Sequence, residues 1–165
     1  MNSARADQNI AKFTITNTAN SGGYSATVKY LNFSLSGTIS NTAGTDRTLS
    51  IYKDSTSTTA LGTTTFKGTS MASGTAYSYS NTNIDNAGMT DVEISANSSK
   101  TFYVTLDTTP AVATNSLSIT IPNYHVTKST LGGVGAFGIG WSDGVTTTIV
   151  GNDTLLPLGY KTITY

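Results

Sequence analysis

The chain has 165 residues, of which only 11% are charged, and its nine basic and nine acidic side chains cancel to a net charge of zero. A balanced charge provides no basic surface, so we expect no nucleic-acid partner and no binding to anionic lipid. The chain also has no cysteine, which excludes disulfides, thiolate metal sites and a cysteine nucleophile.

Short stretches in which Ser or Thr alternates with an apolar residue recur along the chain, separated by Gly, Asn and Asp. Alternation with a period of two indicates strands with one buried and one solvated face. The expected strands are Ile10–Thr16, Ala26–Leu35, Thr48–Lys53, Thr64–Lys67, Ala76–Ser80, Asp91–Ile94, Lys100–Asp107, Ser116–Ile121, Ala136–Trp141, Val145–Val150 and Tyr160–Tyr165. The pattern predicts an all-β protein with minimal helix: a single domain over residues 1–165, folded as an antiparallel β-sandwich of Greek-key, jelly-roll or Ig-like type.

The buried faces of these strands can be read from the alternation. We expect the core to contain Phe13, Ile15, Leu31, Phe33, Leu35, Leu49, Ile51, Val92, Ile94, Phe102, Val104, Leu106, Leu117, Ile119, Ile121 and Trp141. The stretch 54–65 is rich in Ser and Thr and poor in apolar residues, which favours a long hairpin arm or an exposed loop. Gly recurs at nearly every second position of 131–140, a spacing typical of a strand that another backbone or an aromatic side chain approaches closely.

No run of about 18 apolar residues is present, so we expect no membrane insertion. The first eight residues, Met1–Gln8, lack the apolar region of a signal peptide. A Ser/Thr-rich, charge-poor composition nevertheless favours an extracellular or cell-surface location.

No catalytic constellation emerges from the sequence. The stretch Gly68–Gly74 resembles the nucleophile motif of subtilisin-like serine proteases, with Ser70 as the nucleophile. The only histidine, His125, follows that serine, whereas the base precedes it in the family, and the family's Asp and His motifs are missing. A protease needs all of these parts, so we predict that the protein is not an enzyme.

We expect no cofactor, although calcium is a candidate ligand. Turn segments at Asp85-Asn86, Asp143-Gly144 and Asn152-Asp153 supply oxygen atoms of the kind that calcium prefers. Ordinary turn chemistry explains the same residues without a metal.

Four passages carry a family resemblance: Ala11–Thr16, Asn97–Leu106, Gly140–Gly144 and Leu155–Gly159. Together they resemble the Ser/Thr-rich β-sandwich modules at the C-termini of predicted cell-surface proteins of candidate-phyla-radiation (Patescibacteria-type) bacteria. The resemblance implies a secreted, envelope-associated module, and it provides no catalytic residues to carry over.

The sequence favours a structural subunit that assembles with other copies of itself into a surface filament or layer by β-strand addition. The candidate assembly residues are Ile10, Phe13 and Ile15, with residues 1–16 as an exchanged N-terminal strand, or Tyr160, Ile163 and Tyr165 at the other end.

Two alternatives stay open. One is an adhesin or carbohydrate-binding module that recognises cell-envelope glycans through an aromatic surface made of Tyr77, Tyr79 and Trp141. The other is a decoration or tail protein of a phage virion.

Overall fold

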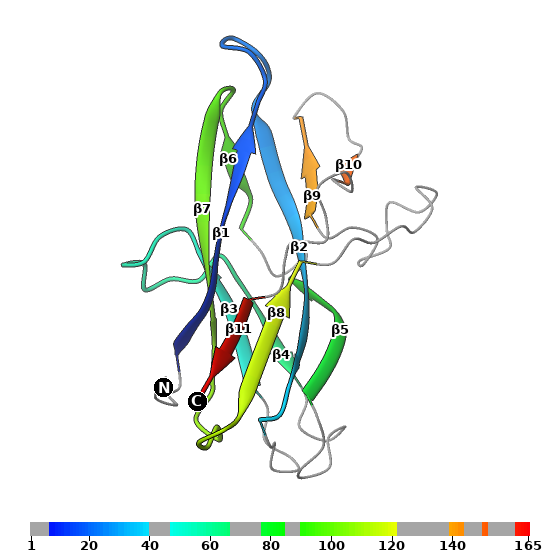
Figure 1. The fold of residues 1–165 in the computed structure, drawn as a ribbon. Helices are drawn as coiled ribbons and strands as arrows, with labels where there is room; N and C mark the ends of the chain where they lie inside the picture. The colour runs from blue at the N-terminus through cyan, green and yellow to red at the C-terminus, as the bar shows by residue number, and fades with distance from the viewer. Residues whose placement is uncertain are drawn as a thin grey trace.

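The structure is a computed structural model, and it describes residues 7–39, 47–66, 77–84, 90–121, 139–143, 150–151 and 161–165. These residues form strands and connections, with no helix among them (Figure 1). The strands are β1 (Gln8–Asn17), β2 (Ala26–Gly37), β3 (Arg47–Tyr52), β4 (Gly62–Phe66), β5 (Tyr77–Ile84), β6 (Val92–Ile94), β7 (Ser98–Leu106), β8 (Ser116–Thr120), β9 (Ile139–Ser142), β10 (Val150–Gly151) and β11 (Lys161–Thr164).

The all-β prediction is confirmed, and each expected strand overlaps an observed one. Of the strand expected over Val145–Val150, the structure describes only Val150, which lies in β10; positions 145–149 lie outside the described residues. The Ser/Thr-rich stretch 54–65 is divided between the connection from β3 to β4 and strand β4 itself. It is therefore the hairpin that the sequence predicts.

The strands form two antiparallel sheets. Sheet A has the order β1-β7-β3-β4, and sheet B has the order β10-β9-β2-β8-β11, with β5 and β6 also paired to β2. Neighbours such as β1 and β7, or β2 and β8, are far apart in sequence, as in Greek-key sandwiches.

Sheet B is four strands wide, although it contains seven labelled strands. Leu31 of β2 pairs with Ile84 of β5 and also with Ile139 of β9, so β5 and β9 lie on opposite sides of β2. On one side of β2, β6 pairs with its first residues and β5 with its later ones. On the other side, β9 pairs with the first part of β2 and β8 with its end. The outermost position is filled by β10 beside β9 and by β11 beside β8. Each of these three positions is thus filled by two short strands that lie end to end.

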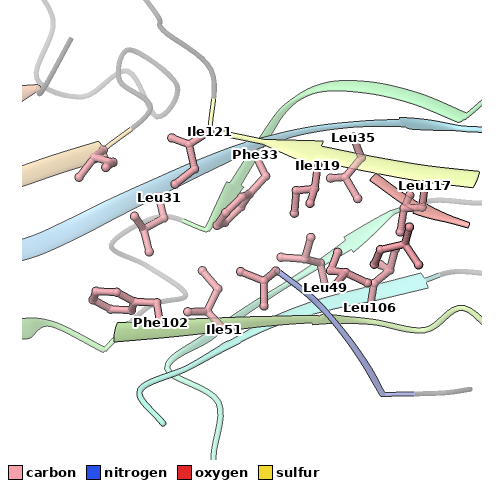
Figure 2. Packing of buried hydrophobic residues seen from close by; sticks show 14 of the residues in the cluster. Leu31, Phe33, Leu35, Leu49, Ile51, Phe102, Leu106, Leu117, Ile119 and Ile121 are labelled. Carbon is pink, nitrogen blue, oxygen red and sulfur yellow. The ribbon is translucent and has the colours of Figure 1, made fainter. Parts of the chain in front are cut away.

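The core lies between the two sheets, and Figure 2 shows its packing. The residues of the predicted core that are buried are Leu31, Phe33, Leu35, Leu49, Ile51, Val92, Ile94, Phe102, Val104, Leu106, Leu117, Ile119 and Ile121. Burial of one such side chain contributes about 1.5–3 kcal/mol to folding. The alternating residues of β2 and β7 therefore account for much of the stability.

Three residues of the predicted core are only half-buried. Phe13 and Ile15 pack against the core from β1, and they retain some exposure because β1 is an edge strand. Trp141 is half-buried near the end of β9, so its placement in the core was wrong.

The outward-facing hydroxyls explain the Ser/Thr-rich composition. Thr14 and Thr101 lie opposite each other in β1 and β7, with their Oγ1 atoms 2.9 Å apart. In sheet B, Ser118 of β8 and Thr162 of β11 make a similar contact of 2.9 Å. Such cross-strand pairs stabilise a sheet by about 0.2–1 kcal/mol each.

A partly buried ion pair lies at the end of sheet A. The Arg47 Nη1 donates to Asp107 Oδ2 at 2.7 Å, and the Arg47 residue is only 6% exposed. Partial burial opposes ionisation of Asp107, but the N–H and hydroxyl of Thr109 and the Arg47 guanidinium outweigh it and hold the pKa of the carboxyl below its usual value. Asp107 therefore remains a carboxylate into the acid range.

The contribution of the core to stability can be tested by truncating one of its largest buried side chains. Phe102→Ala removes a fully buried ring and should lower the free energy of unfolding by about 3–5 kcal/mol. Thr48→Ala, on the exposed face of β3, should lower it by less than about 1 kcal/mol. Urea denaturation followed by circular dichroism measures both, and equal losses would contradict the packing described above.

The ion pair gives a second prediction. Asp107→Asn removes the negative charge beside the buried Arg47 guanidinium and should cost about 1–3 kcal/mol at pH 7. In the unsubstituted protein, the contribution of Asp107 is complete above the unfolded pKa of about 3.9 and is lost as the pH falls through the lower folded pKa. Unfolding measured between neutral and acid pH should show a smaller acid loss in the variant, and parallel pH profiles would disprove the assignment.

Candidate assembly interface

The first and last strands lie at sheet edges on the same side of the sandwich (Figure 1). β1 ends the order of sheet A, and β11 ends that of sheet B. Between them is a cavity of about 270 Å³, lined by Gln8, Asn9, Ile10, Ala11 and Lys12 of β1 and by Thr162 and Ile163 of β11. We call this cavity the terminal-strand groove. The predicted assembly residues Ile10 and Ile163 both line it.

Strand β1 provides apolar side chains to the core from this edge. Its register with β7 shifts between Asn9 and Ala11, and Ile10, which lies within that bulge, is only 1% exposed. The Phe13 ring stacks on Phe102 of β7, with centroids 5.3 Å apart, and meets Phe33 of β2 edge-on at 6.1 Å. β1 is therefore an integral part of the core as well as an edge strand.

The two backbone edges of β1 differ. One edge pairs with β7 from Gln8–Leu106 to Asn17–Ser98, while no strand in the described parts of the chain pairs with the other. A bulge and an outward lysine protect an edge from further strand addition, and β1 has both, at Asn9–Ala11 and at Lys12. These features disfavour the addition of a further strand beside β1.

The connection from β1 to β2 is a hydrogen-bonded turn. It spans residues 18–25 and passes from sheet A to sheet B. Asn17 holds its start: Nδ2 donates to the Tyr24 carbonyl at 2.9 Å and to the Ile94 carbonyl at 3.0 Å. Gly22 has a φ of 86°, which favours glycine. If fully extended, eight residues can span about 26 Å.

Strand β11 is fixed within its own fold. Ile163 and Tyr165 are 7% and 3% exposed, and both belong to the core of the single molecule. The Tyr165 N–H donates to the Asn115 carbonyl at 2.9 Å, and the Thr114 N–H donates to the Tyr165 carbonyl at 2.8 Å. Tyr160 lies outside the described residues. These bonds make β1 the better candidate for exchange.

The predicted aromatic surface is divided by the topology. Tyr77 and Tyr79 belong to β5, and Trp141 belongs to β9. Because β5 and β9 lie on opposite sides of β2, these aromatic residues are not on neighbouring strands. Their strands alone therefore provide no continuous stacking surface.

Sequence reasoning missed two residues that hold β1. Gln8 is 5% exposed, and its Oε1 accepts a bond of 2.8 Å from the Thr108 hydroxyl. The Asn17 side chain donates hydrogen bonds both to the β1–β2 connection and to β6. Asn17 at the end of an alternating run was a usable signal, since Asn commonly bonds to nearby backbone. Gln8 gave none, because its partner is 100 positions away.

The chemical candidates are placed as follows. Ser70 and His125 lie outside the described residues, as do Asp85, Asn86 and positions 144, 152 and 153 of the calcium candidates. Across the described ranges, no three His, Cys, Asp or Glu side chains form a group that could hold a metal ion. Within the same ranges, no helix is long and apolar enough to cross a membrane.

Comparison of the chain with protein-family models, with curated proteins and with solved structures found no match. Our functional proposal therefore rests on the contacts of β1 within the fold.

Proposed function

We propose that the protein is a non-enzymatic extracellular structural subunit that assembles with other copies of itself at the cell surface. The joining event is exchange of β1, so that β1 of one copy occupies the place beside β7 of the next. One observation carries the proposal: β1 is an edge strand that buries Ile10 and packs Phe13 and Ile15 against the core, and an eight-residue connection joins it to the other sheet. Strand exchange of this kind is a known route to oligomers.

Exchange preserves the contacts of the single molecule. An incoming β1 would bring the same Ile10, Phe13 and Ile15 to the same neighbours, Phe102 and Phe33. If each copy donates to one neighbour and accepts from another, the contact is heterologous and propagates into a filament. The bulge and Lys12 limit growth along other directions.

The buried side chains set the rate of exchange. Release of β1 exposes Ile10, Phe13 and Ile15, and each costs up to about 1.5–3 kcal/mol. A released strand is therefore rare, so exchange is slow, and a finished joint is correspondingly slow to open. This property suits a durable surface polymer.

The composition is compatible with close assembly. A net charge of zero removes the repulsion that keeps many proteins apart. The outer hydroxyls of Thr14, Thr16, Thr101 and Ser99 are satisfied across β1 and β7, with Thr16 and Ser99 2.8 Å apart. The same pairs would form across an exchanged joint.

An engineered disulfide tests exchange directly. The Thr14 and Thr101 hydroxyls meet at 2.9 Å, and the chain has no other cysteine, so Thr14→Cys with Thr101→Cys should form one defined bond. Oxidation of the monomer should fix β1 to its own β7 and prevent polymers in negative-stain electron microscopy. Reduction should restore them, and oxidation after assembly should give covalent multimers on a denaturing gel.

The single Thr14→Cys variant controls for loss of the hydroxyl pair and should assemble as the unsubstituted protein does. Assembly of the oxidised double variant at the reduced rate would show that β1 is not exchanged. A reduced protein that stays monomeric at high concentration would contradict self-assembly itself.

A peptide gives an independent test with the full-length chain. A peptide of residues 7–17, in large excess, should take the place of incoming β1 strands and shorten the polymers. The matched peptide with Ile10→Asp should have little effect, because a carboxylate at a position that is 1% exposed costs several kcal/mol. Light scattering during assembly distinguishes the two, and equal effects of both peptides would contradict the proposal.

A further inference from the structure

A second cavity lies on the outer face of sheet A and shares only Asn9 with the terminal-strand groove. It has a volume of about 440 Å³ and is lined by Asp7, Asn9, Tyr52, Asp54, Ser55, Ser57, Thr58, Tyr103 and Thr105. We call it the outer-face groove. Its volume lies within the range of about 300–1,000 Å³ that is usual for small-molecule sites.

Two aromatic rings form the floor of this groove. Tyr52 of β3 and Tyr103 of β7 are register partners, so their side chains project side by side from the same face. That face is the outer one, because Ile51, Phe102 and Val104, which alternate with them, are buried in the core. Both tyrosines are half-buried, so part of each ring remains accessible.

The β3–β4 connection forms one wall. It projects from sheet A in Figure 1, and four of its residues line the groove. Asp54 shapes its first turn, since Oδ1 accepts from the Thr56 N–H and from the Thr56 hydroxyl, both at 3.0 Å. The Thr56 hydroxyl and N–H also hold the pKa of Asp54 below its usual value, so the wall carries a carboxylate at neutral pH.

The opposite wall comes from Asn9 of β1 and from Asp7, which lies just before β1. Asn9 pairs with Thr105 of β7 and provides an amide, and Asp7 provides a second carboxylate. Lys12 lies 5.8 Å from the centroid of the Tyr103 ring, at the outer limit of a cation–π contact, and does not line the groove. The lining therefore combines an aromatic floor with carboxylate, amide and hydroxyl groups and has no cationic side chain.

This combination restricts the ligand. An anionic ligand such as a phosphate or an acidic sugar would meet Asp7 and Asp54, and no cationic side chain lines the groove to offset them. A wholly apolar ligand would leave the convergent polar groups without partners. A neutral sugar fits both parts, since its C–H face stacks on aromatic rings and its hydroxyls donate to carboxylate and amide oxygens.

We propose that the outer-face groove binds a short neutral oligosaccharide. Tyr52 and Tyr103 lie beneath the sugar ring, and Asp54, Asp7 and Asn9 accept hydrogen bonds from its hydroxyls. The site differs from the aromatic set Tyr77, Tyr79 and Trp141 that the sequence indicates. In the unexchanged molecule a single copy provides every lining residue, so binding can be measured on the monomer.

The test is isothermal titration calorimetry of the full chain with cellotriose, chitotriose and mannotriose, and with trigalacturonate as the acidic probe. At least one neutral trisaccharide should bind, and Tyr103→Ala should weaken that binding by about tenfold. Tyr103→Phe retains the ring and should bind within about twofold of the unsubstituted protein. Tyr24→Ala is the matched control, because Tyr24 is an exposed tyrosine (68%) outside the groove, and it should have no effect.

Asp54→Asn covers the case in which Tyr103→Ala does not fold. Asp54 lies in a connection outside the core, and its loss should weaken binding several-fold without a change in thermal unfolding. No binding of any neutral probe up to about 10 mM would overturn the proposal. Tighter binding of trigalacturonate would overturn it too, as would equal effects of Tyr24→Ala and Tyr103→Ala.

Discussion

The contact of Phe13 with Phe102 and Phe33 is the interaction on which the rest of the structure depends. It joins three strands, since Phe13 belongs to β1, Phe102 to β7 and Phe33 to β2. β1 and β7 are neighbours in sheet A, whereas β2 is the central strand of sheet B, so the three rings hold the two layers together at one side. The same contact makes β1 necessary for a complete core, and it is the contact that the proposed strand exchange would re-form.

The sequence predicts the strands and the core well because alternation is a local property. Leu31, Phe33 and Leu35 alternate with polar residues, and the structure buries all three. The prediction that Trp141 lies in the core was wrong, because its exposure depends on its place near the end of the short strand β9. Alternation does not reveal that place. The edge position of β1 leaves Phe13 and Ile15 half-exposed for a similar reason.

The candidate sites are less predictable because strand pairing creates them. Tyr52 and Tyr103 are 51 positions apart, and only the β3–β7 register brings them together. Tyr77, Tyr79 and Trp141 appear equally promising in the sequence, yet their strands flank β2 on opposite sides. Ile10 and Ile163 line one groove because β1 and β11 end their sheets on the same side, which also requires the strand order.

The two proposals meet at β1. Asp7 and Asn9 line the outer-face groove, and both would travel with β1 in an exchanged polymer. Each groove would then be composite, with Asp7 and Asn9 from one copy and Tyr52, Tyr103 and Asp54 from the next. Repetition along a filament would let many weak sites act together on a polymeric glycan.

The hydroxyl pairs between strands have a consequence for the conditions that the protein tolerates. Thr14–Thr101, Thr16–Ser99 and Ser118–Thr162 are contacts between neutral groups, so dissolved ions do not screen them as they screen surface ion pairs. Neutral hydroxyls also do not titrate between acid and mildly alkaline pH. These pairs should therefore hold the outer faces together equally well in fresh water and in brine.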